Sequence, residues 1–266
     1  NLAFATEFAA FPSNHLGLVR PDGTFDLYDG VLRAVDESGE KILNDVEAGR
    51  YADVLVEEVR PWSYMKFPFL RELGPQKGWY RVGPLARLAV CERIATPEAE
   101  AARVQFDEAM GGRPGTMSLA YHWARMIETL SAIEEIEQLL DDPDIEGDDL
   151  VRKGERRPES VGVIEAPRGT LFHHYVVADD DTVMRANLIV STTSNNEPMN
   201  RAVESVAKKF LTGTEITEGL LNHVEVAIRA YDPCLSCATH ALGKMPLVIE
   251  IQDAGGRTLA EGKRNS

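Results

Sequence analysis

Two cysteines three positions apart are the residues of this chain best suited to chemistry. Cys234 and Cys237 lie in the stretch YDPCLSCATHALGKMPL, behind an Asp-Pro pair and ahead of His240. A Cys-x-x-Cys spacing at the end of a helix directs two sulfurs toward one point. Thiolates act as nucleophiles and bind soft metals. The stretch is therefore a redox motif, a pair of metal ligands, or a coincidental spacing.

The residues alone support three interpretations of this pair. A thioredoxin-like redox pair needs a strand before it and a helix N-terminus at it, but Pro233 and a predicted helix precede Cys234. A zinc site of Cys234, Cys237 and His240 usually has a second ligand pair, and the chain has no second Cys-x-x-Cys and no His-x-x-x-His. The third interpretation is a soft transition metal with further ligands from elsewhere. The spacing alone leaves all three open.

Composition excludes several other classes of function. The 266 residues are 44% hydrophobic and 27% charged, which is enough for one sizeable core or two small ones. A net charge of -15 leaves no basic surface for nucleic acid. No apolar run is long enough to span a bilayer, and the first residues do not resemble a signal peptide. Three cysteines make no disulfide framework, and we expect Cys91 to be a buried apolar residue.

The hydrophobic pattern predicts one domain with both helices and strands. Short apolar runs between turn signals predict small β-hairpins over residues 15–45, and Gly, Pro and aromatic residues predict an ordered loop over 64–85. A surface loop is expected over 141–160 because it is charged and aperiodic. Periodicity predicts helices at 96–111, 117–141, 198–212 and 215–230, strands near 161–165, 171–178 and 183–190, and a final hairpin turning at 255–256.

The helix predicted over 117–141 shows the clearest apolar stripe. The stripe consists of Leu119, Trp123, Met126, Leu130, Ile133 and Leu140. Its spacing of three and four residues predicts that this side packs on the core. Several carboxylates mostly lie off the stripe, and they are predicted to form a solvated face and no metal site. These carboxylates are Glu128, Glu134, Glu135 and Glu137.

A longer motif is much more specific than the cysteine pair. The string RAYDPCLSCATH resembles the Asp-Pro-Cys-x-x-Cys-x-x-His signature at the C-terminal end of [NiFe] hydrogenase large subunits. VGVIEAPRGTLFHHY and LIVSTTSNNEPMNRAV resemble two further segments of that family, while YMKFPF and GWYRVGPLARL are similar to its cytoplasmic, bidirectional NAD-coupled branch. These motifs cover most of the chain in family order. The resemblance implies a mainly α (α+β) fold, with a multi-helix core and small peripheral β-hairpins.

The resemblance also implies which residues form a metal centre. In this family nickel is held by four thiolates, two of which bridge to an iron that carries cyanide and carbon monoxide. Cys234 matches a terminal nickel ligand, and Cys237 matches a bridge between nickel and iron, in agreement with the preference of these metals for thiolates. His240 matches the residue that becomes the C-terminus and helps to bind a Mg or Fe ion.

A second group of residues is implied to surround that centre. Arg168 matches an arginine above the open metal position, where its fixed charge polarises H2. Asp232 is implied to pair with Arg168 and orient it. Pro167 and Thr192 are implied to surround the diatomic ligands of the iron. His173 and His174 are expected to be structural only.

The implied reaction is reversible heterolytic cleavage of H2, with the Cys234 sulfur as proton acceptor. Electrons would leave through the Fe-S clusters that a small subunit carries, and they would pass to NAD(P) through FMN-containing diaphorase subunits. The family also implies a nickel chaperone and a maturation endopeptidase as partners, and a cytoplasmic location.

Two departures from the family pattern bear on what the chain is. The family's other nickel-binding Cys-x-x-Cys is absent, so residues 1–240 are predicted to be the C-terminal part of a large subunit that is inactive by itself. Residues 241–266 are predicted to be an extension removed on maturation. One alternative is an inactive precursor or fragment held by a nickel chaperone or endopeptidase. Another is a non-catalytic relative of complex I, against which Cys234 and Cys237 argue.

Overall fold

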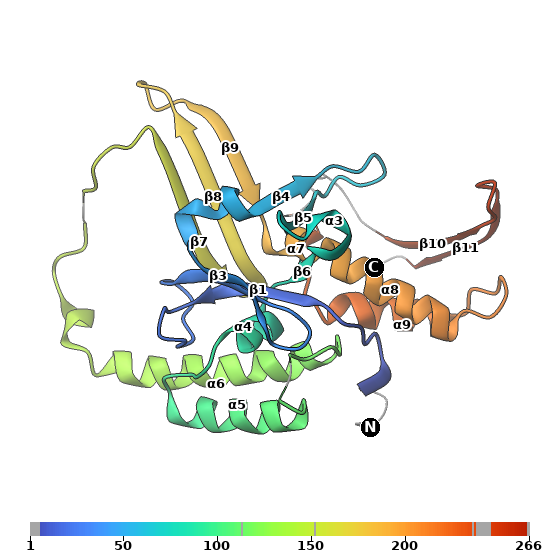
Figure 1. The fold of residues 1–266 in the computed structure, drawn as a ribbon, viewed down its shortest axis with the longest axis horizontal. Coiled ribbons are helices and arrows are strands. Elements are labelled where there is room, and N and C mark those ends of the chain that lie inside the picture. The colour runs from blue at the N-terminus through green and yellow to red at the C-terminus, as the bar shows by residue number, and fades with distance from the viewer. Residues whose placement is uncertain (1–5, 113, 152, 236, 238–245, 265–266) are drawn as a thin grey trace.

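A four-stranded sheet forms much of the first third of the chain. The computed structural model describes residues 6–112, 114–151, 153–235, 237 and 246–264. The sheet has the strand order β3–β2–β1–β6 (Figure 1), with β1 antiparallel to β2 and parallel to β6. Its strands are β1 (Asn14–Val19), β2 (Val31–Val35), β3 (Lys41–Glu47) and β6 (Tyr80–Arg81).

The two sides of this sheet face two different cores. Leu16 and Leu18 of β1 lie opposite Ala34 and Leu32 of β2, and all four are at most 2% exposed. Because successive residues of a strand point to opposite sides, the intervening residues face the other way. There Arg33 donates to the carbonyl of Val90, 3.3 Å away. The strands therefore help to build both cores of the protein.

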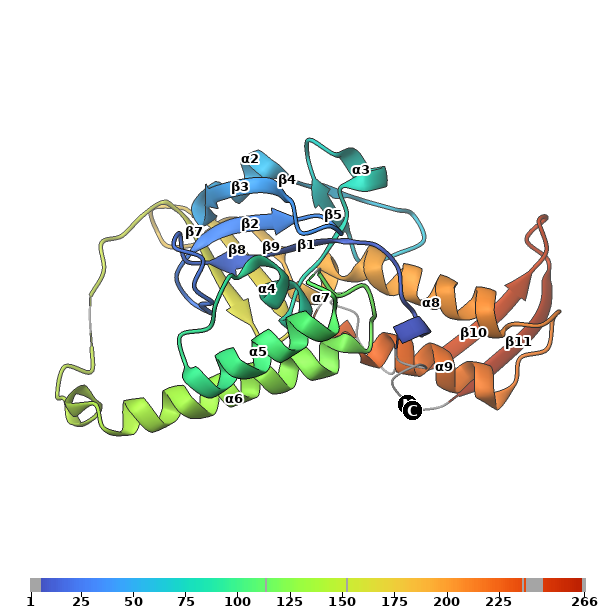
Figure 2. The same cartoon turned by 60° about the horizontal axis from the view of Figure 1, so that its bottom comes forward.

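The second core lies among helices. In this core α4 lies between the four-stranded sheet and α6, and α5 packs along α6 (Figure 2). Its buried residues include Leu85, Tyr121, Ala202 and Val224, each at most 4% exposed. The helices are α4 (Pro84–Val90), α5 (Pro97–Ala109), α6 (Ala120–Leu140), α8 (Asn196–Phe210) and α9 (Glu218–Arg229).

A three-stranded antiparallel sheet carries a two-residue turn at Pro167 and Arg168. Its strands, in the order β7–β8–β9, are β7 (Glu159–Ala166), β8 (Gly169–Val177) and β9 (Val183–Ile189). Gly169 has φ +135°, and a Cβ added there would lie 2.4 Å from Cγ2 of Val82. Only glycine fits this conformation and this space, so the turn lies directly against the start of α4.

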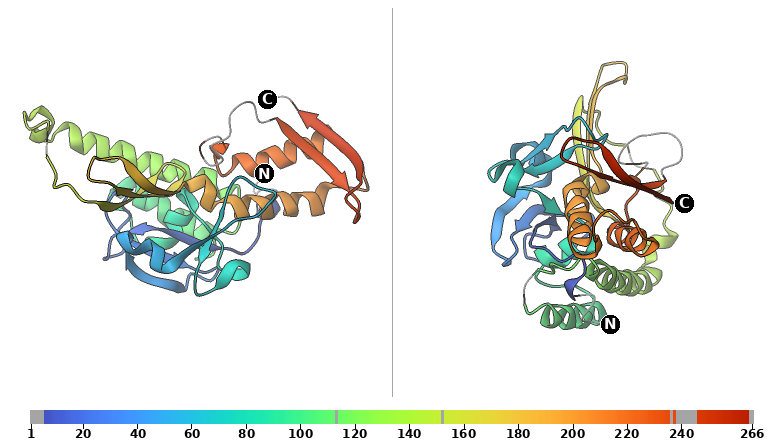
Figure 3. Two further views of the ribbon diagram at one scale, coloured as in Figure 1. Left: turned by 90° about the horizontal axis from the view of Figure 1, so that it is seen from above. Right: turned by 90° about the vertical axis from the view of Figure 1, so that its right-hand side faces the viewer.

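The remaining described elements are short. α7 (Ser191–Ser194) follows β9, and the hairpin of β10 (Leu247–Gln252) and β11 (Thr258–Arg264) lies beside α9 at one edge of the molecule (Figure 3). The other short elements are β4 (Leu55–Glu58) paired with β5 (Phe67–Leu70), α2 (Tyr51–Val54), α3 (Gly74–Lys77), and 3-10 helices at Ala48–Arg50 and Pro143–Glu146.

None of the described helices is both long and apolar enough to cross a membrane.

The structure contains both helices and strands, in agreement with the α+β part of the predicted class, and most of the predicted elements match observed ones. The predicted ordered loop over 64–85 is wrong in part, since it contains β5, α3, β6 and the start of α4. Phe67 and Leu70 are buried there because β5 pairs with β4. Cys91 is buried as expected, and burial raises the pKa of its thiol to about 12.

The predicted core-facing side of α6 is wrong in part, since Leu119 and Leu130 pack against the core but other residues of the stripe do not. Met126, Ile133 and Leu140 of the apolar stripe are 65%, 58% and 67% exposed. The buried side consists largely of other residues, namely Ala120, Tyr121, Ala124, Ile127 and Ser131. Small side chains on this side let α4 and α5 approach closely. Such residues do not stand out in a pattern of large apolar residues.

Candidate metal centre

Three segments that are distant in sequence form the candidate centre. They are the β7–β8 turn, α7, and the chain that leaves α9. Helix α9 is capped by Thr217, whose hydroxyl oxygen accepts from the backbone N–H of Leu220 at 3.1 Å. At its other end Tyr231 is buried, with its ring centroid 4.8 Å from that of Tyr121. These contacts fix the chain immediately before Asp232.

Arg168 and Asp232 lie in contact. Nε of Arg168 donates to the backbone carbonyl of Asp232 at 2.6 Å and lies 3.3 Å from the carboxylate oxygen Oδ2. Asp232 has φ +50°, a left-handed conformation that aspartate tolerates better than most residues. Both side chains are about half exposed, so their ion pair contributes little to stability. Its geometric effect is to link the β7–β8 turn to the cysteine segment.

Helix α7 makes a second link between the same two segments. The backbone N–H of Cys234 donates to the hydroxyl oxygen of Thr192 at 3.1 Å, and Thr192 is 2% exposed. The neighbouring hydroxyl of Ser191 donates to the carbonyl of Gly169 at 2.6 Å. One turn of helix therefore touches both the strand that follows Arg168 and the first cysteine.

The two cysteines of the motif face each other. The structure joins Cys234 to Cys237 as a disulfide with a Cα–Cα distance of 5.4 Å. Metal binding requires both as thiolates, so the geometry shows that the sulfurs can reach one point. Two soft sulfur donors fit part of a site for nickel or iron, and they do not fit an oxygen-ligated cation.

The described residues do not complete a ligand set. Within ranges 6–112, 114–151, 153–235, 237 and 246–264, no group of three or more His, Cys, Asp or Glu residues could hold a metal ion. His240, predicted as a ligand of a Mg or Fe ion, lies outside the described residues. Among the described residues, Cys234 and Cys237 are therefore the metal ligands that this chain offers.

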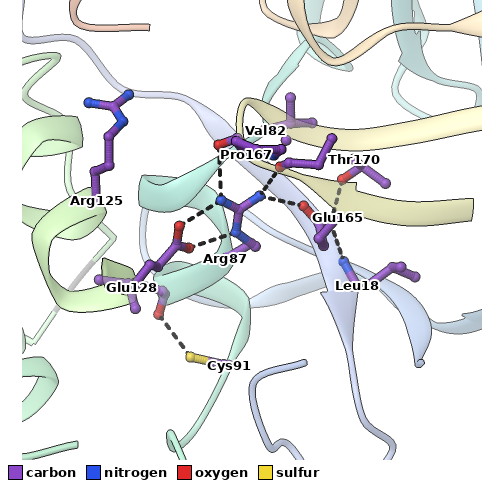
Figure 4. A network of polar contacts seen from close by, with 12 residues as sticks. Leu18, Val82, Arg87, Cys91, Arg125, Glu128, Glu165, Pro167 and Thr170 are labelled. Atoms are coloured by element: carbon purple, nitrogen blue, oxygen red, sulfur yellow. Dashed lines mark hydrogen bonds and ion pairs between the residues drawn. The ribbon is translucent and has the colours of Figure 1, made fainter. Parts of the chain in front are cut away.

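A buried ion cluster lies directly behind the β7–β8 turn. It consists of Arg87, Glu128 and Glu165 (Figure 4) and is called the Arg87 cluster below. Nε and Nη2 of Arg87 donate to Glu128 at 2.6 and 2.7 Å, and Nη1 donates to Glu165 at 2.8 Å. Burial raises the pKa of the Glu165 carboxyl, and the charge of Arg87 opposes that shift.

Two carboxylates of α6 differ from the prediction of a solvated face. Glu128 was predicted to lie on a solvated face, but its side chain is 12% exposed because it pairs with Arg87. Glu134 also has a specific task, since it accepts from the backbone N–H groups of Glu98 and Ala99 at 2.9 Å and so caps α5. Sequence reasoning missed Arg87 itself. The available signal was one arginine within the apolar run of GPLARLAV.

The two adjacent histidines lie on β8 and are both partly buried. Nδ1 of His174 lies 3.0 Å from the hydroxyl of Tyr51, and its Nε2 lies 2.7 Å from Glu159. His173 packs edge-on against Tyr175. These contacts agree with the structural role that was expected for both.

A comparison with protein families covers the segments that form this site. Residues 28–240 match the family described as nickel-dependent hydrogenase, a range that includes every residue of the candidate centre. The chain therefore belongs to the nickel-dependent hydrogenase family.

Two curated relatives illustrate the similarity. The chain is 48% identical over 261 residues to the beta subunit of the NAD-reducing hydrogenase HoxS of Cupriavidus necator, covering 97% of this chain and 53% of that protein. It is 41% identical over 254 residues to one subunit of the vhc F420-non-reducing hydrogenase of Methanococcus voltae, covering 94% and 53%. The chain thus spans about half the length of these relatives.

Solved structures agree with the fold. A crystal structure of NAD+-reducing [NiFe]-hydrogenase in the H2-reduced state superposes with a TM-score of 0.85 at 53% identity, over 90% of this chain and 53% of that one. The reduced [NiFeSe] hydrogenase of D. vulgaris Hildenborough gives a TM-score of 0.63 at 22% identity, over 90% and 55%, and supports the fold alone.

Proposed function

We propose that this chain is part of the catalytic subunit of a [NiFe] hydrogenase that cleaves H2 reversibly and heterolytically, coupled to NAD(P). The observation that carries the proposal is the contact of Arg168 and Thr192 with the Asp-Pro-Cys-x-x-Cys segment. The 48% identity to part of an NAD-reducing hydrogenase supports the choice of NAD(P) as acceptor.

In this proposal Cys234 and Cys237 hold a Ni–Fe centre, which supplies Lewis-acid activation of H2 when it is bound. The chain's own residues then have separate tasks. Thr192 holds the backbone of Cys234 in place, and the Cys234 sulfur accepts the proton. Arg168, which contacts Asp232 two residues before Cys234, provides a fixed positive charge at the cysteine segment. Because a guanidinium does not lose its proton in proteins, it acts through its field and not as a base.

Asp232 orients Arg168 through both its carbonyl and its carboxylate. Pro167 and Thr192 are proposed to surround the cyanide and carbon monoxide ligands of the iron. His240 is proposed to help bind a Mg or Fe ion. Electrons would pass to Fe-S clusters on a small subunit, then to diaphorase subunits carrying FMN, in a cytoplasmic complex.

The proposal is tested by nickel content and H2 uptake. We expect stoichiometric nickel and H2-dependent reduction of NAD+ in the complex purified from nickel-replete cells. Neither is expected from the isolated 266-residue chain, because Cys234 and Cys237 supply half of the thiolates that the family uses. A nickel-free complex would support a complex I-like relative instead. An active isolated chain would refute the proposal that this chain supplies only half of the thiolates.

A second proposal concerns the segment after His240. We propose that residues 241–266 are removed once nickel is inserted. Within this segment the β10–β11 hairpin contacts α9, where Arg264 donates to Asn222 at 2.8 Å and also pairs with Glu218. We expect an intact mass that ends at His240 from nickel-replete cells, and a full-length mass from nickel-starved cells. An uncut chain with full activity would contradict this expectation.

A further inference from the structure

We propose that Arg87 is a positioning residue for Arg168, and that it acts by fixing the backbone of the turn that carries Arg168. The inference rests on the proposed function. It concerns a residue that contacts neither cysteine in the described structure but reaches the two residues immediately before Arg168 in the chain.

All five N–H donors of the Arg87 guanidinium have acceptors. Three of them point at carboxylates within the Arg87 cluster (Figure 4). The other two point at the turn, where Nη1 donates to the carbonyl of Ala166 at 2.9 Å and Nη2 donates to the carbonyl of Pro167 at 3.2 Å. Since Arg87 is 1% exposed, water does not compete for these donors.

The turn is held on both sides of Arg168. Before it, Arg87 fixes the carbonyls of Ala166 and Pro167 from α4. After it, Ser191 donates to the carbonyl of Gly169, whose Cα lies against Val82. A two-residue turn at the end of a hairpin would otherwise be among the more mobile parts of a sheet. Fixing these three carbonyls around Arg168 sets the direction in which its half-exposed side chain leaves the backbone.

The number of N–H donors explains why an arginine is required. Glu165 is anchored independently, because it accepts from the backbone N–H of Leu18 at 2.8 Å and from the hydroxyl of Thr170 at 2.7 Å. Glu128 comes from α6. The planar fork of Arg87 binds both carboxylates and still has two donors for the turn, whereas lysine has three donors in all. Lysine therefore preserves the charge but not the set of contacts.

The test compares holoenzyme complexes with Arg87→Met, Arg87→Lys, Arg168→Met and the double variant Arg87→Met/Arg168→Met. We expect Arg87→Met to lower kcat about 10- to 100-fold, as loss of an outer-shell partner does, with Arg87→Lys in between. In the Arg168→Met background, Arg87→Met should cause no further loss, because both changes act through one side chain. Independent losses that multiply would overturn the proposal.

A readout without activity accompanies this cycle. Hydrogen–deuterium exchange of a peptide over residues 164–171 should accelerate in Arg87→Met, and less in Arg87→Lys. The matched control is Arg33→Met, since Arg33 is equally buried, at 1% exposed, and pairs with Asp45 and Glu92 away from the turn. It should leave kcat and exchange over 164–171 unchanged. Unchanged exchange in Arg87→Met would overturn the proposal.

The outcomes separate this inference from the proposed function. A wild-type complex without nickel or H2 uptake would refute the function, while faster exchange over 164–171 would still support the fixing of the turn by Arg87. If the Arg87→Met complex does not assemble, kcat and exchange over 164–171 are measured on Arg87→Lys and Glu128→Gln instead. If none of the three assembles, the cluster is a folding requirement and the positioning role is rejected.

Discussion

Replacing Cys234 by serine is expected to remove nickel from the complex and to lower H2 uptake at least about a thousandfold. This loss exceeds the roughly 10- to 100-fold typical of an outer-shell partner, because Cys234 is proposed both as a nickel ligand and as the proton acceptor. A serine hydroxyl is a hard donor that stays protonated at neutral pH, so it replaces neither role. Metal analysis and H2-dependent NAD+ reduction measure the two effects separately.

The matched control is Cys91→Ser. Cys91 is buried on the C-terminal side of α4, its Sγ lies 3.8 Å from the carbonyl of Leu88, and burial raises its thiol pKa to about 12. Such a thiol stays protonated at neutral pH, and among the described residues Cys91 belongs to no group of three or more His, Cys, Asp or Glu that could hold a metal ion. We expect wild-type nickel and uptake in Cys91→Ser, with a small loss of stability. Full nickel occupancy in Cys234→Ser would contradict the ligand assignment.

The sequence predicted the local elements and the motif well because both depend on local signals. Turn residues and alternating apolar positions mark β1, β2 and β3, and a Thr-Pro start marks α5. The string around Cys234 is specific by itself. The structure then brings Arg168 and Thr192 to that string across 64 and 42 residues of sequence.

The sequence failed where long-range packing decides the outcome. Glu128 sits on a helix rich in carboxylates, and its pattern resembles a solvated face. Only the tertiary structure shows that the guanidinium of Arg87, 41 residues away, draws it inward. The same applies to α6, where Ala124 and Ser131 are buried because α4 and α5 approach them, while Met126 stays exposed. A pattern within one helix carries no information about its neighbours.

Replacing Arg168 by methionine is expected to lower kcat about 10²- to 10³-fold while nickel stays bound. The effect corresponds to about 3–4 kcal/mol of transition-state stabilisation, the range for loss of one preorganised electrostatic group. Nickel stays bound because Cys234 is held independently, by Thr192. Arg168→Lys retains the charge but not the planar fork, so its kcat should fall between methionine and wild type. Kinetics with H2 and metal analysis on the same preparations test both statements.

The control for Arg168 is Arg185→Met. Arg185 lies on β9 of the same sheet, is 61% exposed, and pairs with Glu159 at 2.9 Å. Removing it deletes an exposed ion pair of similar kind, so any general effect of lost surface charge appears in both variants. We expect wild-type kcat from Arg185→Met.

Replacing Asp232 by asparagine should lower kcat less than Arg168→Met does. Asp232 is about half exposed, and the backbone carbonyl of residue 232 still accepts from Arg168. A larger loss in Asp232→Asn than in Arg168→Met would mean that the carboxylate acts on the centre directly and not through Arg168.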